Sequence, residues 1–311
     1  MFFKNAYIFA FTQSFNTSEL ELNAAMHEHS FTPLGSTEMS HYGWTSSLGK
    51  GSDLTTESNG NILICARKEE KILPAPVIKE MVAERVEQLE AEQGRSATKK
   101  EREQFKEDVI FELLPRAFNR ITDTYGYINA KENIIVIDSA SRGKAEDFLA
   151  LLRKTLGTLP VTSVSPEVDP SEVMTDWLNG NLARQQVFIT NNFAFGEDAE
   201  FQALGDNGAV AKVKDQDLNS PEVMAHLQSG KYATKLALDY DDSISFMLHD
   251  DLSIKRIKFA DVIAEQNDDY GSDDVQGKLI ADFTLMAGEL NLIINSLHGE
   301  FNIKATDYLE A

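Results

Sequence analysis

Lysine and arginine residues that alternate with apolar residues are the groups that point most clearly to a function in this sequence. Because side chains alternate between the faces of a strand, Lys212 and Lys214 are predicted to share one face. A sheet that packs on one side and presents cations on the other suits contact with nucleic-acid phosphates. Any one run is weak evidence, since lysines are common on strand surfaces. The runs are Arg67-Lys68-Glu69-Glu70-Lys71, Ala211-Lys212-Val213-Lys214, Lys231 to Lys235, and Ser253 to Phe259 with Lys255, Arg256 and Lys258.

Familiar catalytic patterns are missing from the sequence. The six histidines form no Ser-His-Asp, Cys-His or His-Glu-x-x-His arrangement, and His27 and His29 lack a third ligand nearby. Gly43 to Gly51 resembles a phosphate-binding loop, but its spacing is wrong and Gly51 replaces the Ser or Thr that would bind magnesium. The single cysteine, Cys65, cannot form an intramolecular disulfide and is expected to be a small core residue. We therefore expect neither an enzyme nor a cofactor.

Three acidic runs could bind divalent ions. They lie at 239–242, 249–251 and 268–274, and none has the spacing of a calcium-binding loop. Solvated turns are the favoured interpretation, so no metal is expected. A metal-dependent nuclease stays a distant alternative.

The charge of the chain is distributed unevenly. The net charge is −21, yet the segment from Asn61 to Arg120 holds 12 basic and 12 acidic residues, so the whole excess of negative charge lies outside it. An acidic protein repels nucleic acid from most of its surface. DNA binding is therefore compatible with this composition only if the cations gather on one face or around one channel.

The pattern of apolar residues predicts an α+β fold with mixed and antiparallel sheets and packed helices. The apolar N-terminus, 2–12, favours a buried strand over a signal peptide, and no segment is apolar enough for a membrane span. A helix follows at 19–29, with Leu20 and Ala24 expected to face the core. A hairpin is expected at 120–138, then a helix at 141–157 and a strand at 159–164.

The second half is expected to start with a helix at 171–178 that is capped by Ser171. Strands are expected at 186–189, 193–195 and 209–213, and a helix at 221–228. A meander follows over 233–259, and a long apolar helix over 274–298.

Two charged helices interrupt the first half, at about 76–93 and 98–114. Gly94-Arg95-Ser96 separates them, so we predict a helical hairpin that projects from the body. Its even mixture of charges is most typical of a solvated face. The predicted organisation is a central α+β domain (1–74 and 117–165), a helical-hairpin tip (75–116) and a second α+β domain (166–311).

Several segments together resemble the RdgC family of bacterial recombination-associated proteins. The resemblance spans about residues 1 to 300 and keeps its order along the chain. It is carried by the runs from Ile62 to Pro74, Leu113 to Phe118, Ala150 to Lys154, Thr234 to Asp239, Lys255 to Phe259 and Ala281 to Leu290.

This resemblance implies a cytoplasmic, nucleoid-associated protein without enzymatic activity. It implies a ring-shaped homodimer whose positively charged hole holds double-stranded DNA without sequence preference, with single-stranded DNA bound more weakly. It further implies antagonism of RecA-dependent strand exchange, with effects on recombination and replication-fork repair. An acidic exterior around a basic hole would explain a DNA-binding chain of net charge −21.

The cations of the runs become candidate phosphate contacts on this basis. Phe118, Lys214 and Gln216 are expected at the dimer interface, although Asp215 interrupts the lysine pair that the family carries before Gln216. The candidate DNA-binding residues are Arg67, Lys68, Lys71, Arg116, Arg120, Lys212, Lys214, Lys231, Lys235, Lys255, Arg256 and Lys258.

One rival hypothesis remains open from the sequence. The acidic surface could mimic DNA, so that the protein acts as an interaction scaffold on a recombinase without binding DNA. Salt discriminates between the two, because a surface that neutralises phosphates loses affinity steeply as salt rises.

Overall fold

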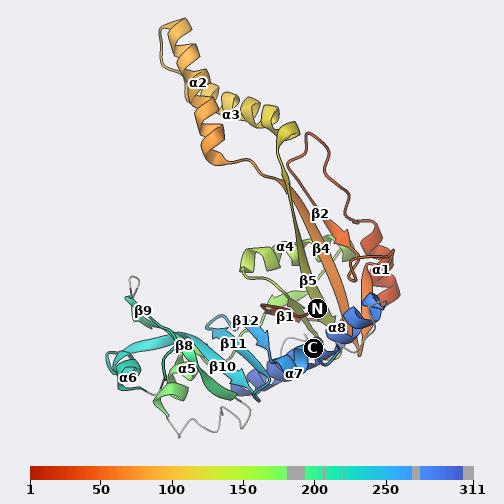
Figure 1. The fold of residues 1–311 in the computed structure, drawn as a ribbon, viewed down its shortest axis with the longest axis vertical. Coiled ribbons are helices and arrows are strands. Elements are labelled where there is room, and N and C mark those ends of the chain that lie inside the picture. Colours follow the sequence, from red (N-terminus) through yellow and green to blue (C-terminus); the bar gives the residue numbers. More distant parts are fainter. Residues whose placement is uncertain (181–192, 206–207, 219, 268–273, 304–311) are drawn as a thin grey trace. The chain divides into compact units, whose positions relative to one another are not determined.

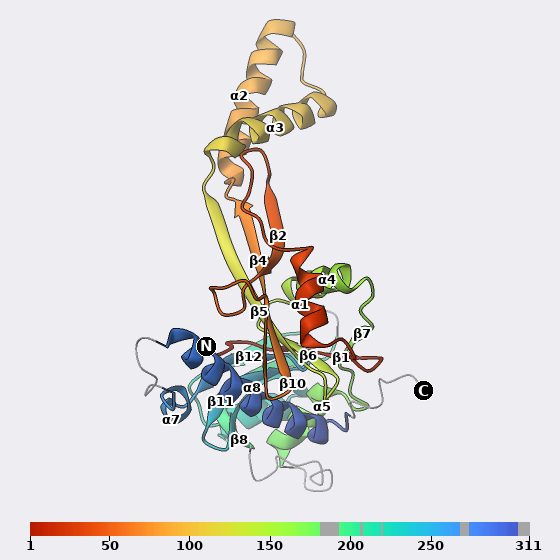
Figure 2. The same ribbon diagram turned by 90° about the vertical axis from the view of Figure 1, so that its right-hand side faces the viewer.

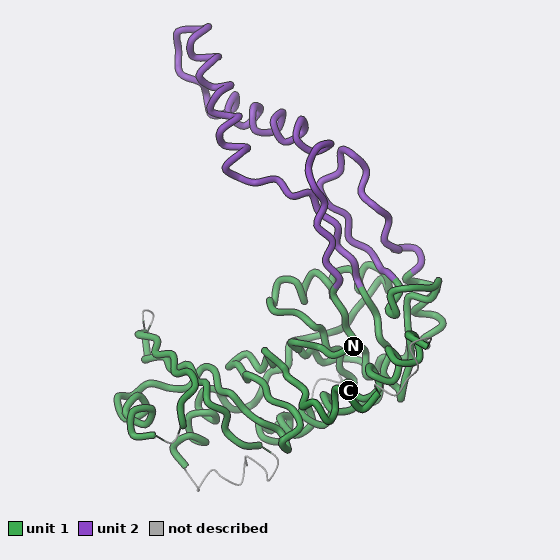
Figure 3. Tube along the Cα trace, viewed as in Figure 1, with its two compact units in different colours: residues 1–26, 46–65, 124–311 green, residues 27–45, 66–123 purple. Residues whose placement is uncertain are grey.

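The computed structural model describes residues 1–180, 193–205, 208–218, 220–267 and 274–303. They form the mixed α+β fold predicted from the sequence, with two largely antiparallel sheets and packed helices. The contacts divide the chain into two compact units, coloured separately in Figure 3. Unit 1 holds residues 1–26, 46–65 and 124–311, and unit 2 holds residues 27–45 and 66–123. The three-part division expected from the sequence stays a prediction.

A seven-stranded sheet has the order β2-β4-β5-β6-β1-β7, with β3 paired to β4. Its centre is β6 (Ile134–Ile137), which is buried throughout and pairs antiparallel with β1 (Tyr7–Phe11) and with β5 (Asn119–Asn129). The continuous apolar run of β6 predicted this central position, and the hairpin of β5 and β6 is confirmed. The other strands are β2 (Ser40–Thr45), β3 (Thr55–Ser58), β4 (Asn61–Lys71) and β7 (Val161–Ser163).

Helix α4 (Arg142–Leu156) packs on this sheet in unit 1. Ser141 caps it, because its side chain accepts a hydrogen bond from the Lys144 backbone N–H. Phe148 is fully buried, and its ring lies over Gly126 of β5, where an added Cβ would come within 2.9 Å of the ring. Glycine at 126 therefore allows the close approach of helix and strand.

Helix α1 (Glu19–His27) buries Leu22 and Met26. The expectation that Leu20 and Ala24 face the core is wrong, since both are exposed. Both pairs have helical spacing, and the pair with the larger combined apolar area is the one that is buried.

A five-stranded antiparallel sheet, with the order β12-β11-β10-β8-β9, forms the other part of unit 1 (Figures 1 and 2). The predicted meander is confirmed, because the last three strands along the chain, β10 to β12, are neighbours in this sheet. The predicted strand at 186–189 lies outside the described residues. Its strands are β8 (Phe193–Ala203), β9 (Val210–Val213), β10 (Lys231–Tyr240), β11 (Ile244–His249) and β12 (Ile254–Phe259).

Helices α5 (Pro170–Asn179), α6 (Pro221–Gln228) and α8 (Val275–Glu300) contribute to one core with the inward side chains of this sheet. The long apolar α8 confirms its prediction and runs along the sheet in both views of Figures 1 and 2. The cap of α5 differs from the prediction. Asp169 takes this position and accepts from the Ser171 N–H, because proline at 170 begins the helix. The short helix α7 (Asp261–Ala264) follows β12.

Unit 2 contains helices α2 (Ala75–Gln93) and α3 (Lys99–Leu113) and the short 3-10 helix η1 (Leu114–Arg116). Gly94 ends α2 in the left-handed conformation, and Thr98 with Glu101 forms a capping box for α3. Each helix buries one residue, Val86 in α2 and Val109 in α3. The two helices match their predicted ranges, whereas their projection and the ring-forming homodimer stay predictions. None of the described helices is long and apolar enough to cross a membrane.

Candidate nucleic-acid interface

One face of the five-stranded sheet carries a row of charged and polar side chains from four neighbouring strands. The register places Lys212 of β9 opposite Glu200 of β8, Glu200 opposite Lys235 of β10, and Lys235 opposite His249 of β11. Their neighbours Phe201, Leu236 and Leu248 are buried in the core on the other face. The alternation of polar and apolar residues thus brings cations far apart in sequence into one row.

Glu200 binds both lysines of this row. Its two carboxylate oxygens lie 3.1 Å from Nζ of Lys212 and 2.8 Å from Nζ of Lys235. Burial alone would raise the pKa of Glu200, but hydrogen bonds from Lys235 and Lys212 and their charges outweigh it and lower that pKa below its usual value. Glu200 is therefore ionised at neutral pH.

Arg256 joins the row through a β-bulge. Arg256 and Ile257 of β12 lie opposite the single residue Phe246 of β11, and Arg256 has a left-handed backbone with φ of 51°. In a regular strand Arg256 would point to the same face as buried Ile254, but the bulge leaves it exposed and turns Ile257 into the core. Its guanidinium group lies 3.0 Å from the Asp198 carboxylate.

These side chains surround a small cavity of about 60 Å³. We name its four cations, Lys212, Lys214, Lys235 and Arg256, the sheet cluster. With the carboxylates of Asp198 and Glu200, the six groups carry a formal charge of +2. In a chain of net charge −21 this is a local reversal of sign, as a phosphate-binding surface requires.

The remaining cations predicted in unit 1 lie in different settings. Lys255 is buried, with its Nζ 3.6 Å from the centre of the Tyr7 ring and 3.1 Å from the Ala140 carbonyl oxygen. Burial keeps Lys255 away from an approaching DNA backbone. Lys258 is exposed opposite Ser245, and Lys231 contacts the His226 ring at 3.1 Å.

The candidate cations on β4 point to both of its faces. Arg67 points to one face, where it forms two hydrogen bonds of 2.7 Å to Asp123 and lies over the Phe31 ring. Lys68 and Glu70 point to the other face, where Glu70 pairs with Lys68 at 3.4 Å and with Arg120. The Arg67-Lys68-x-x-Lys71 run therefore does not form a single cluster.

Lys71 is half-buried at the end of β4, and Arg116 is exposed in η1. Surface ion pairs such as those of Lys68 and Arg120 with Glu70 contribute only about 0–1 kcal/mol, so a phosphate can replace the Glu70 carboxylate at either cation.

The residues predicted for the dimer interface are exposed. The Phe118 side chain is 84% exposed, and exposed Ile72 lies beside it, since the Ile72 N–H donates to the Phe118 carbonyl oxygen at 2.8 Å. In unit 1, Lys214 and Gln216 are also exposed, and the Gln216 N–H donates to the Glu197 carbonyl oxygen. Such exposure of a large aromatic side chain suits an interface.

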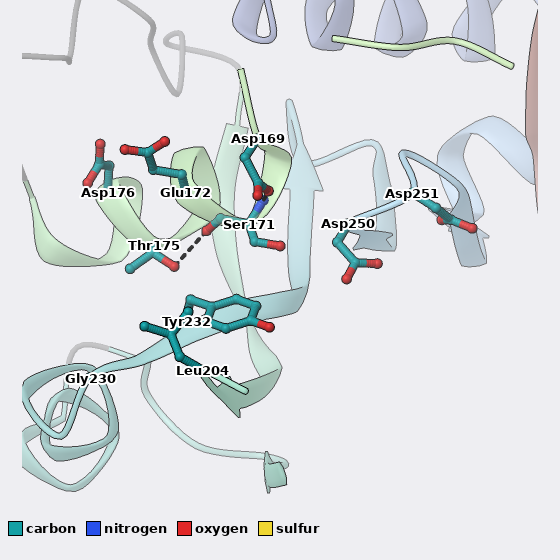
Figure 4. Close-up of a pocket in the computed structure, with 10 residues that line it drawn as sticks. All are labelled: Asp169, Ser171, Glu172, Thr175, Asp176, Leu204, Gly230, Tyr232, Asp250 and Asp251. Carbon is teal, nitrogen blue, oxygen red and sulfur yellow. Dashed lines mark hydrogen bonds between the residues drawn. The ribbon is translucent and has the colours of Figure 1, made fainter. Parts of the chain in front are cut away.

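A second pocket of unit 1, of about 710 Å³, has the opposite charge (Figure 4). Tyr232 and Leu204 line it, and the Thr175 hydroxyl donates to the Ser171 carbonyl oxygen at 2.6 Å. Burial and then the charge of Asp251 raise the pKa of Asp250. DNA phosphates would be repelled here. The acidic lining residues are Asp169, Glu172, Asp176, Asp250 and Asp251.

No arrangement for metal chemistry occurs within the described residues. These residues contain no group of three or more His, Cys, Asp or Glu side chains that could hold a metal ion. Of the acidic runs, 268–273 lies outside these residues. Cys65 is buried in β4, as expected for a core residue.

Sequence reasoning missed the carboxylates that hold the cations, Asp198, Glu200 and Asp123. The alternation around Glu200 could have suggested its face. Its two lysine partners depend on strand order, which the local pattern does not show.

Fold and surface together define a mixed α+β protein with a cationic sheet face in an acidic chain. The RdgC family model, described as "Putative exonuclease, RdgC", matches residues 1–304, and the chain belongs to this family. This confirms the resemblance inferred from the sequence.

Relatives named "Recombination-associated protein RdgC" match along nearly their whole length. The protein of Colwellia psychrerythraea is 61% identical over 311 residues, which cover 100% of this chain and 99% of the relative. Those of Aeromonas hydrophila and Tolumonas auensis are 46% and 44% identical over 299 and 298 residues, covering 96% of this chain in each case and 96% and 97% of the relatives.

Proposed function

We propose that this chain binds double-stranded DNA without sequence preference, through phosphate contacts made by its exposed cations. The observation that carries the proposal is the sheet cluster, in which four cations from β9, β10, β12 and the residue after β9 surround one small cavity. Contacts to phosphates position a protein on DNA but carry no sequence information. The cluster offers lysine and arginine side chains on a sheet rather than a recognition helix, which supports binding without sequence preference.

We further propose that two copies form a ring-shaped homodimer around the duplex. Phe118 supports this, because burying such a side chain in an interface contributes about 1.5–3 kcal/mol. Lys214 and Gln216 are the proposed contacts in unit 1. Single-stranded DNA would bind more weakly, since fewer phosphates would meet the cations.

The proposed cellular role is antagonism of RecA-dependent strand exchange at the nucleoid, with consequences for replication-fork repair. The names of the relatives, which contain "recombination-associated", support this role. Occupying the duplex would be sufficient to restrain strand exchange. No catalytic step is part of the proposal.

The test is titration of the purified chain onto fluorescent duplexes of two unrelated sequences, with molar mass measured in parallel. We expect equal affinity for both duplexes and the mass of a dimer. A protein that ignores both duplexes at low salt would contradict DNA binding. It would favour instead the acidic scaffold, which the net charge of −21 and the acidic pocket around Asp250 support.

A nuclease is the second candidate, because the family model carries the word exonuclease in its description. Incubation of end-labelled duplex DNA with the protein and Mg²⁺ tests it. Shortening of the labelled strand that chelation of Mg²⁺ abolishes would establish nuclease activity. An intact strand under conditions where the protein binds the duplex would support binding alone.

A further inference from the structure

Two carboxylates lie inside the surface proposed to meet DNA. Asp198 and Glu200 are both on β8, and their side chains are 21% and 18% exposed. Glu200 binds Lys212 and Lys235, and Asp198 binds Arg256. Three of the four cations of the sheet cluster are thus already paired with a carboxylate of the same chain.

We propose that Asp198 and Glu200 compete with DNA phosphates for these cations and so lower the affinity of the chain for DNA. The inference rests on the proposed function, since it assigns to the same surface the residues that set its strength. It identifies two residues that act against binding, where the candidate contacts all act in its favour.

The geometry indicates that Glu200 competes with phosphates for Lys212 and Lys235, rather than only holding the two lysines in place. Both oxygens of Glu200 are in use, at 3.1 Å and 2.8 Å, so its negative charge lies directly beside the two ammonium groups. A phosphate that approached Lys212 or Lys235 would meet this charge at close range. Like charges in contact repel, and the three paired cations stay 33–65% exposed, so another anion can reach them.

Asp198 acts on Arg256 through one of its two carboxylate oxygens. One carboxylate oxygen contacts the guanidinium group at 3.0 Å, and the other accepts from the Asp215 N–H at 3.2 Å. The Arg256 side chain is 57% exposed despite this pair. A phosphate can therefore reach the guanidinium group, but only against the charge of Asp198.

The expected effect follows from counterion release. Each phosphate contact contributes about −0.9 to the slope of log affinity against log salt, which is about a 3.5-fold loss of affinity between about 50 and 200 mM salt. Removing one competing carboxylate should strengthen up to about one phosphate contact for Asp198→Asn and up to about two for Glu200→Gln, because each cation would contact phosphate without its partner's opposing charge. We expect both variants to bind duplex DNA roughly threefold to tenfold more tightly at about 50 mM salt, with a steeper slope.

Glu197→Gln is the matched control. Glu197 lies on the same strand, its side chain is exposed, and it does not line the cavity of the sheet cluster. Its substitution changes the net charge by the same amount. If general charge alone mattered, all three variants would bind with the same gain.

The experiment measures affinity of the full chain and of the three variants for one fluorescent duplex across a salt series, with thermal unfolding as the check on folding. Tighter binding and a steeper slope for Glu200→Gln and Asp198→Asn than for Glu197→Gln support the inference. If the wild type binds DNA and neither variant exceeds the control, the inference is overturned while the proposed function stands. If no protein binds, both fall.

A double-mutant cycle gives a second measurement that does not depend on the absolute affinity. Lys212→Met should cost more affinity in the Glu200→Gln background than in the wild type, because Glu200 no longer offsets Lys212. Equal losses in the two backgrounds would overturn competition between Glu200 and DNA.

Discussion

Asp198 of β8 and Arg256 of β12 form an ion pair of 3.0 Å, although β10 and β11 lie between their strands in the sheet. Both residues occupy irregular parts of the ladder. The register between β8 and β10 shifts near Asp198, and that between β11 and β12 shifts at Arg256. Bulges increase local twist and redirect side chains, which allows this pair to span two strands.

Because Arg256 has a left-handed backbone, its replacement by glycine should affect DNA binding and folding stability in different ways. Arg256→Gly should leave folding stability unchanged or raise it by up to about 1 kcal/mol, because glycine adopts this conformation without strain. The same change should weaken DNA binding and reduce the magnitude of the salt slope by up to about 0.9, because it removes a cation whose contact with phosphate Asp198 already weakens. Chemical denaturation and DNA titration measure the two effects.

Asn59→Gly is the control for this prediction, since Asn59 has a nearly identical φ of 50° in the turn before β4. It should change stability without changing DNA binding. Undiminished DNA binding by Arg256→Gly would remove Arg256 from the contact surface.

The dimer prediction concerns Phe118. Phe118→Ser should shift the measured mass from dimer toward monomer at a given concentration, by about 1.5–3 kcal/mol for each side chain buried in the interface. Its own folding stability should change little, because the side chain is 84% exposed. Sedimentation equilibrium measures the shift.

Phe111→Ser provides the comparison, because Phe111 is 65% exposed in α3 of the same unit. Equal weakening of the dimer by both variants would mean that general loss of apolar surface, rather than Phe118 itself, controls association.

Acid should destabilise the chain through His249. Burial, and then the charge of Lys235, lowers the pKa of His249 to about 4. A folded-state pKa below the unfolded value of about 6.5 means that the unfolded chain binds the proton more tightly. Stability from the neutral ring is therefore fully present above about pH 6.5 and is lost as the pH falls toward about 4.

The measurement is the free energy of unfolding at about pH 7 and about pH 5. His249→Asn should show a smaller loss of unfolding free energy on acidification than the wild type, because it removes the buried ring that must stay neutral. If the unfolding free energy of His249→Asn depended on pH as that of the wild type does, the lowered pKa of His249 would be contradicted.

Replacing two glycines by alanine should change the stability of the chain in opposite directions. Gly126→Ala should destabilise unit 1 by about 1–3 kcal/mol, because the new Cβ would come within 2.9 Å of the buried Phe148 ring. Gly143→Ala in α4 should be neutral or stabilise by up to about 1 kcal/mol, because nothing lies within 4 Å of its new Cβ. Thermal unfolding of the two variants tests the pair, and the same sign for both would contradict it.

Local signals made much of the fold predictable. Thr98 with Glu101, Ser141 and Gly94 are helix boundaries set by a few neighbouring residues, so the ranges of α2, α3 and α4 were close to their predictions. Local signals did not predict which face of α1 is buried, the one with Leu20 or the one with Leu22. Both have the same spacing, and only tertiary packing decides between them.

The candidate site depended on what lies across the sheet. Ile254 and Ile257 are three residues apart, which a regular strand cannot bury together, and the bulge at Arg256 resolves this. Burial of Lys255 under Tyr7 and pairing of Lys235 with Glu200 involve residues far along the chain. Local pattern therefore found the cations but could not tell which are accessible and which are paired.

The most direct test of phosphate binding by the sheet cluster is the slope of log affinity against log salt for duplex DNA. It compares the wild type with Lys212→Met/Lys235→Met, and Lys131→Met/Lys144→Met provides a control outside the cluster. We expect the cluster variant to lose up to about 1.8 from the magnitude of the slope, since each phosphate contact contributes about 0.9, and the control to keep the wild-type slope. Equal slopes for all three proteins, or no binding by the wild type at low salt, would contradict the account.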